Sequence, residues 1–308
     1  TQSAPFRTLE KASEILNGND TLYLHEGIHR GVLNLNFKKA DEAHPIIIRS
    51  FPGDQVTIDG TMDITDGWTD EGGGLYSCVL DQDIWGLYYH DSMMMAARWP
   101  NASIYDFNFF NQKETYRDMS TQSSLGIIHD ARPFNNELSE YYELPKDGSF
   151  GYIRNGYNEQ SLSETGVSMA GAVAIMNSGS WITWASTITS HEAGSNTFEY
   201  DSMFTASGST RNSALSWTRP RVVQITPAET RLENHLDDRI SKNHCHYYIE
   251  GLPCLDSSGE WWYVPDTHTL WFYPPSGEDP NGETVKVKVR DYNVIGSQSG
   301  YITIKDID

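Results

Sequence analysis

Four short apolar segments, residues 21–24, 32–35, 45–48 and 55–58, follow one another near the start of the chain. Each is bounded by turn residues such as Pro52-Gly53 and Asp59-Gly60. The first and third segments are 24 residues apart, and the second and fourth are 23 residues apart. A nearly constant step of this kind is typical of a solenoid, because one coil buries its apolar face only when the next coil stacks on it. The spacing predicts a right-handed parallel β-helix, with a β-sandwich as the alternative.

Two further segments complete the predicted solenoid. Residues 5–16 have helical apolar spacing before the first strand, so we expect a helix that caps the open end of the coils. Near the end of the chain, residues 285–290 alternate valine, expected to face inward, with Lys286, Lys288 and Arg290, expected to face outward. Residues 300–304 form another strand pattern. We therefore expect the β-helix to resume at 283–308 and to need further coils after Asp308.

Residues 61–282 lack the step of the coils. They contain irregularly spaced strands rich in aromatic residues, and the segments 260–264 and 269–273 form a predicted hairpin across 265–268. The expected fold is all-β, with a parallel β-helix at 1–60 and 283–308 interrupted by a large antiparallel β-rich insert at 61–282.

Composition limits the partners that this chain can have. The formal net charge is −20, from 22 basic and 42 acidic residues, which argues against nucleic acid as a ligand. No apolar run is long enough to span a membrane, and the sequence starts with Thr and shows no signal peptide, as in a mature or trimmed product. Three cysteines are an odd number, so we expect buried thiols, with a Cys245–Cys254 bridge as the alternative.

Several motifs carry a resemblance to known proteins. They are Ser3 to Leu9, Gly18 to Leu24, Pro45 to Ser50, Val56 to Gly60, Ala96 to Asn101, Leu255 to Tyr263, Thr269 to Pro275 and Gly300 to Ile304. The opening motifs resemble secreted right-handed parallel β-helix carbohydrate-active proteins, which include alginate- and chondroitin-type polysaccharide lyases. The later motifs resemble glycoside hydrolases of this fold with an inserted β-domain. This resemblance implies that the catalytic carboxylates lie on later coils, which these 308 residues do not contain.

Carboxylates are the first candidates for chemistry, since glycoside hydrolysis uses a pair of them. Asp256 and Glu260 lie in one of the resembling motifs, and Asp291 follows the basic segment. The alternative for Asp256 and Glu260 is a structural role in a tight turn.

Basic and aromatic residues are the candidates for binding a sugar. Lys286, Lys288 and Arg290 form a basic cluster that could neutralise an acidic sugar, as a lyase requires, or simply be a solvated strand face. Arg98 and Trp99 end an apolar strand next to long irregular segments. For Trp99 we favour the core over a sugar platform. In the pair Trp261-Trp262, one ring is free to face outward, and Trp262 is our candidate.

The sequence gives little support for a metal. His244 and His246 share a strand face, but no second pair stands at zinc spacing. An acidic run could hold calcium, yet it lacks the spacing of a calcium loop, so we expect no cofactor, with calcium as the alternative. The run consists of Asp54, Asp59, Asp63, Asp66 and Asp70.

Together these patterns predict the N-terminal portion of an extracellular enzyme, secreted, periplasmic or at the cell surface, that degrades a complex algal or plant polysaccharide. A glycoside hydrolase is the first interpretation. The alternatives are a polysaccharide lyase and a noncatalytic carbohydrate-binding or adhesin module. The expected partners are polysaccharides or oligosaccharides and the missing coils of the same protein.

Overall fold

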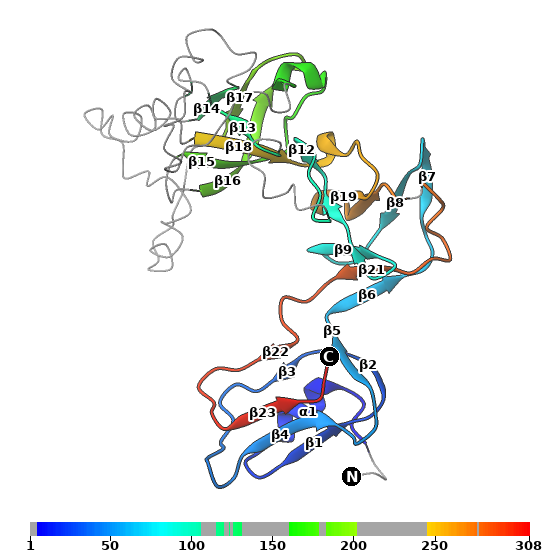
Figure 1. Ribbon diagram of the computed structural model, residues 1–308, viewed down its shortest axis with the longest axis vertical. Coiled ribbons are helices and arrows are strands. Elements are labelled where there is room, and N and C mark those ends of the chain that lie inside the picture. The colour runs from blue at the N-terminus through cyan, green and yellow to red at the C-terminus, as the bar shows by residue number, and fades with distance from the viewer. Residues whose placement is uncertain are drawn as a thin grey trace, which may run out of the picture. The chain divides into compact units, whose positions relative to one another are not determined.

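The structure is a computed structural model that describes residues 5–105, 115–119, 123, 126–130, 160–178, 183–201, 245–275 and 277–308. The chain forms two compact units (Figure 1). Unit 1 comprises Thr1–Gly67, Leu80–Met93 and Pro280–Asp308, and unit 2 comprises Trp68–Val79 and Met94–Asp279. The predicted division at 1–60, 61–282 and 283–308 stays a prediction.

Unit 1 contains one helix and three small parallel sheets. The helix is α1 (Leu9–Ile15), and the strands of the parallel sheets are β1 (Thr21–Leu24), β2 (Gly27–Arg30), β3 (Leu33–Asn34), β4 (Ile46–Ser50), β5 (Val56–Asp59), β22 (Val294–Ile295) and β23 (Ile302–Lys305). The sheet orders are β1-β4-β23, β2-β5 and β22-β3, and every pairing in them is parallel. Beneath them lies a core of leucines, isoleucines and Val56 from the strands and α1.

A fourth sheet of unit 1 is antiparallel. It consists of β6 (Thr61–Ile64), β9 (Gly86–Tyr89), β10 (Ser92–Met93) and β21 (Val285–Lys288), in the order β10-β9-β21-β6. We predicted that residues 285–290 resume the parallel coils, and this was wrong, because β21 pairs antiparallel with both β6 and β9. Alternation in the sequence indicated the buried face of β21 correctly but carried no information on its partners.

Two other expectations need correction. The strand that pairs with β5 is β2, with Gly27 opposite Val56, and not the predicted segment 32–35. The helix starts at Leu9 and not near Pro5, because the Thr8 side chain accepts a hydrogen bond from the backbone N–H of Lys11 at 3.1 Å and so caps the helix there.

Unit 2 contains two larger sheets. One consists of β7 (Thr69–Gly72), β8 (Leu75–Val79), β11 (Met95–Ala96), β19 (Glu260–Val264) and β20 (Thr269–Phe272). The other consists of β12 (Arg98–Trp99), β13 (Arg117–Asp118), β14 (Ile127–His129), β15 (Val173–Ser178), β16 (Thr183–His191), β17 (Thr197–Tyr200) and β18 (Cys245–Glu250). Short 3₁₀ helices are η2 (Leu162–Thr165), η3 (Leu252–Cys254) and η4 (Pro265–Thr267).

Pairing in unit 2 is antiparallel except between β11 and β19. The predicted hairpin is confirmed, since β19 pairs antiparallel with β20 and η4 connects them. The core of this unit includes Trp99, Tyr247 and Phe198. The described chain is therefore all-β in class, as predicted, with mostly antiparallel sheets.

Two cysteines of the described chain, Cys78 and Cys254, are buried free thiols, so the alternative of a Cys245–Cys254 bridge was wrong. The side chain of Cys245 lies outside the described residues.

No helix in the described ranges is long and apolar enough to cross a membrane.

Candidate functional site

A pocket of about 550 Å³ opens on unit 1. It lies where β5 and its turn approach the antiparallel sheet and the segment that follows β21. Its walls are formed by Thr57, Ile58, Asp59, Gly60, Thr61, Tyr88, Asp91, Lys286, Lys288, Arg290, Asp291, Tyr292, Asn293 and Val294. Five residues from the sequence analysis therefore line one cavity, and Asp59 is the one from a distant part of the sequence; the others are Lys286, Lys288, Arg290 and Asp291.

Strand pairing explains why one wall of this pocket is polar. Residues directly opposite each other in antiparallel strands share a face of the sheet. Val285 and Val287 are fully buried, and Leu87, which is opposite Val287, is fully buried as well. The next residues along β21 point to the other face, where Lys286 is opposite Tyr88. The alternation of valine and cation thus supplies a core face and a pocket face from a single strand.

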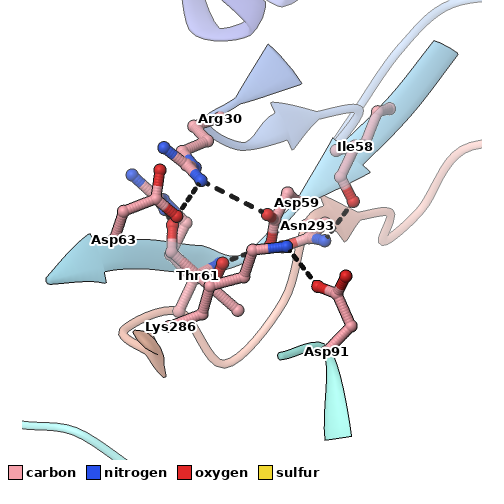
Figure 2. Close-up of polar contacts among 9 residues, drawn as sticks. Arg30, Ile58, Asp59, Thr61, Asp63, Asp91, Lys286 and Asn293 are labelled. Carbon is pink, nitrogen blue, oxygen red and sulfur yellow. Dashed lines mark hydrogen bonds and ion pairs between the residues drawn. The ribbon is translucent and has the colours of Figure 1, made fainter. Parts of the chain in front are cut away.

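Ion pairs fix the frame of the pocket (Figure 2). The Lys286 ammonium lies 2.5 Å from an Asp91 carboxylate oxygen, and this hydrogen bond is the main reason that the pKa of Lys286 is raised. Arg30, on β2, lies 2.6 Å from Asp63 and 3.6 Å from Asp59. These ion pairs fix the side chains of Lys286 and Asp59, and each of the two charges has a partner of opposite sign.

Asp59 is ionised and held by its surroundings. Burial would raise the pKa of its carboxyl group, but hydrogen bonding from Thr61 and the charges of Arg30 and Lys286 outweigh that effect and lower it. The backbone N–H of Thr61 donates to Asp59 Oδ1 at 2.8 Å. A carboxylate stabilised in this way is a poor general acid.

Lys288 and Arg290 differ from Lys286. No carboxylate of the described chain lies within 4 Å of either cation. Arg290 donates to the backbone carbonyl oxygen of Thr61 at 3.4 Å, which uses one of the five N–H donors of a guanidinium group. The pocket therefore presents two cationic groups whose charges are not matched by an ion pair within the described chain.

The segment after Arg290 is positioned by Asn293. The side-chain amide of Asn293 donates to the backbone carbonyl oxygen of Ile58 at 2.8 Å. The backbone carbonyl oxygen of Asn293 accepts a hydrogen bond from the N–H of Leu33 at 2.9 Å. Gly60 permits this close approach, because a Cβ at residue 60 would lie only 2.6 Å from Asn293 Oδ1. Asp291 and Tyr292 are left exposed at the mouth of the pocket, with Tyr292 at 67% exposure.

Arg98 and Trp99 lie in unit 2 and are buried, at 0% and 3% exposure. The Arg98 guanidinium donates to the carbonyl oxygens of Pro100 and Thr115 and lies 3.9 Å from the centre of the Tyr248 ring. Trp99 packs in the core with Arg117 over its ring. Burial supports the core alternative that we favoured for Trp99.

Glu260 is a buried carboxyl group at the start of β19. Burial raises its pKa to about 7, against the opposing effect of backbone N–H donors. The donors are the N–H groups of Asp256, Ser257 and Arg98, at 3.2, 3.1 and 3.4 Å. Glu260 therefore closes the turn before β19 from the inside, which supports the structural alternative.

Asp256 and Trp262 complete the candidates of unit 2. Asp256 is exposed and accepts a hydrogen bond from the side-chain amide of Asn101 at 2.9 Å. Trp262 is half-buried and packs against the core, whereas its neighbour Trp261 is buried. The roles predicted for these residues stay predictions.

Sequence reasoning missed the other walls of the pocket. Tyr88 and Asp91 reach it only because β9 pairs with β21 across almost 200 residues of sequence, and no local pattern indicates that pairing. Asp59 was considered only as a calcium ligand. The place of Asp59 in the wall of the pocket could have been inferred from the turn at Asp59-Gly60, which ends a predicted strand.

No group of three or more His, Cys, Asp or Glu side chains in the described ranges is placed to hold a metal ion. Members of the acidic run instead have local partners: Asp54 contacts His25, Asp59 and Asp63 contact Arg30, and Asp70 accepts from the N–H of Gly72. His244 lies outside the described residues.

A second cavity of about 770 Å³ lies beside α1 and β1. The aromatic rings of Tyr23 and His25 approach that of Phe51, with centroid distances of 5.7 and 4.8 Å. Its walls are mainly apolar, and among the described residues that line it Arg7 is the only arginine, lysine or carboxylate residue. The first pocket therefore offers more groups for polar recognition.

Comparison with known proteins gives a structural likeness but no sequence match. No protein-family model and no curated protein matches the chain. A solved structure named "Glycoside hydrolase" matches over 100% of this chain at a TM-score of 0.58 and 16% identity. At that identity, the match establishes a shared fold. This chain spans 47% of the matched chain, so it covers about half of that protein's length.

Another solved structure, "The complex structure of XylC with xylose", matches 99% of this chain and 32% of its own, at 13% identity. Its TM-score of 0.37 is too low to carry an inference.

Proposed function

We propose that this chain is the N-terminal portion of an extracellular glycan-degrading enzyme of the glycoside hydrolase type. The observation that carries the proposal is the likeness in fold, over the whole chain, to a solved protein of that name. Fold alone does not determine activity. The polar pocket of unit 1 adds support, because it offers charged and aromatic groups in a cavity of a size suited to a small ligand.

The finer architecture that we propose for unit 1 is a right-handed parallel β-helix. In this interpretation β1, β2 and β3 form one coil, β4, β5 and β22 form the next, and β23 begins a third. The register supports it, since β4 pairs in parallel with β1 on one side and with β23 on the other. Asp308 continues the pattern, because its N–H donates to the Val56 carbonyl oxygen and its carbonyl oxygen accepts from the N–H of Ile58.

This arrangement leads to a proposal about catalysis. The resemblance in sequence implies that the catalytic carboxylates lie on later coils, and the matched solved chain is about twice as long. We therefore expect the 308 residues alone to show little or no turnover. The pocket then serves to bind part of the glycan while later coils supply the acid and the base or nucleophile.

A polysaccharide lyase is the second candidate, and the pocket favours it specifically. Lyases remove a proton next to a uronate carboxylate, which requires a cation to neutralise that carboxylate and a base to take the proton. Lys288 and Arg290 supply the cations, because Lys286 is already paired with Asp91. Tyr88 and Tyr292 line the same cavity and are side chains of a type that can act as a base.

The test uses this chain and the longer protein that the proposal expects, with further coils after Asp308. Both are incubated with a panel of plant and algal polysaccharides, and products are analysed for new reducing ends and for unsaturated sugar ends. New reducing ends without unsaturation support a hydrolase, and unsaturated ends support a lyase. Binding without cleavage by the longer protein supports the noncatalytic module. Absence of both binding and cleavage would refute a glycan-related function.

A further inference from the structure

We propose that the pocket of unit 1 binds an acidic sugar residue of a glycan, with Lys288 and Arg290 contacting its anionic group. This deepens the proposed function and rests on it, because it names the chemical class of the ligand. The anionic group is a carboxylate of a uronate residue or a sulfate ester, since both present paired oxygens to a cation.

The arrangement of charges in the pocket is the first observation that supports an anionic ligand. The protein has a formal net charge of −20, so an anion is repelled at long range and must be held by cations that contact it directly. Lys286 is paired with Asp91, and Asp59 shares Arg30 with Asp63. Lys288 and Arg290 have no carboxylate of the described chain within 4 Å, while the exposed Asp291 lines the same pocket and the charge of Arg290 also acts on Glu10.

The positions of Lys288 and Arg290 are the second observation, because both cations are held where they can contact an anion. Lys288 extends from the central strand β21, which is paired on both sides, so its backbone is rigid. Arg290 is tied to the Thr61 carbonyl oxygen at 3.4 Å and keeps further N–H donors for an oxygen pair of the ligand. The residue opposite Lys288 in β9 is Gly86, so no side chain of that residue packs against Lys288.

The two tyrosine rings in the pocket wall are the third observation, and they favour a sugar over a simple anion. Tyr88 is half-buried on the same face as Lys286, and Tyr292 stands at the mouth of the pocket. A sugar ring has apolar C–H faces and polar edges, and a tyrosine ring packs against such a face while its hydroxyl group stays hydrated. A simple anion would have no use for these rings, whereas an anionic sugar uses both the rings and the cations.

The experiment measures binding of defined oligosaccharides to the full 308-residue chain by calorimetry. The probes are an oligogalacturonate, a neutral galactose oligomer of the same length and a sulfated galactose oligomer. We expect the acidic probes to bind at least tenfold more tightly than the neutral one, with an affinity that falls as salt is added. The stronger of the two acidic probes identifies the anionic group.

The test variant is Lys288→Ala combined with Arg290→Ala, and the matched control is Lys305→Ala, which removes an exposed strand lysine outside the pocket. The double variant should lose at least tenfold in affinity for the acidic probe and keep that for the neutral one. The control should bind like the wild type, and Lys288→Arg should retain most of the affinity. Thermal unfolding confirms that each variant is folded.

Equal affinity for acidic and neutral probes would overturn the inference, as would undiminished binding by the double variant. Either result leaves the proposed function standing if neutral glycans bind or are cleaved by the longer protein. A failure of every glycan to bind this chain also overturns the inference. The proposed function fails as well only if the longer protein neither binds nor cleaves any glycan.

Discussion

Glu260 gives the sharpest test of the energetics of unit 2. Its side chain is 3% exposed, and burial raises its pKa from the ordinary 4.5 to about 7. A carboxyl group with a raised pKa in the folded state holds its proton more tightly there than in the unfolded chain. The contribution of Glu260 to the free energy of unfolding therefore falls as the pH rises from about 4.5 to about 7 and changes little outside that window.

The size of the effect follows from the same values. One pKa unit corresponds to about 1.4 kcal/mol, so the stability that depends on this proton amounts to roughly 3 kcal/mol across the window. Glu260→Gln keeps the size and the acceptor oxygen of the side chain but cannot ionise. We expect the variant to lack this part of the pH dependence. The stability of the variant relative to that of the wild type should therefore be higher at pH 8 than at pH 4.

The assay is urea unfolding of both proteins between pH 4 and pH 8, together with hydrogen exchange of the amides of β19. The difference between the two proteins isolates Glu260 from other titrating groups. Glu199→Gln, at an exposed position of β17, is the control and should keep the pH dependence of the wild type. Parallel pH profiles for wild type and Glu260→Gln would refute the reasoning.

Three further substitutions test other parts of the structure. Trp99→Ala should destabilise unit 2 by about 3–5 kcal/mol in urea unfolding and leave glycan affinity unchanged, because Trp99 is core; weaker glycan binding with unchanged stability would contradict this. Gly60→Ala should displace the Asn293 side chain and lower stability by about 1 kcal/mol, the value of one hydrogen bond, with little added loss when combined with Asn293→Ala. Thr8→Ala should cost about 1 kcal/mol in thermal unfolding by removing the cap of α1, and Thr8→Ser should restore it.

Local patterns predicted local structure well in this chain. The alternation at 285–288 identified Val285 and Val287 as buried, and turn residues placed the hairpin of β19 and β20 correctly. These features depend on side-chain burial and turn geometry, which are encoded within a few residues.

Pairing partners were harder to predict. Segment 32–35 has the apolar pattern of a core strand, whereas β2 has a single apolar side chain, yet the three-dimensional path of the chain places β2 beside β5. The basic residues of the pocket were identified from the sequence, whereas Tyr88 and Asp91 were not, because their place beside Lys286 depends on a contact between distant strands. Information of this kind is absent from any short window of sequence.

The point at which the chain leaves the parallel strands is also the point to which it returns. The N–H of Val289 donates to the carbonyl oxygen of Gly60 at 3.2 Å, and Thr61 is opposite Lys288 in the antiparallel sheet. The ends of the intervening segment are therefore adjacent in space, which is the geometry that tolerates insertion and replacement of a domain. During evolution, residues 61–288 could have been gained, lost or exchanged between relatives as one cassette without altering the register of the strands on either side.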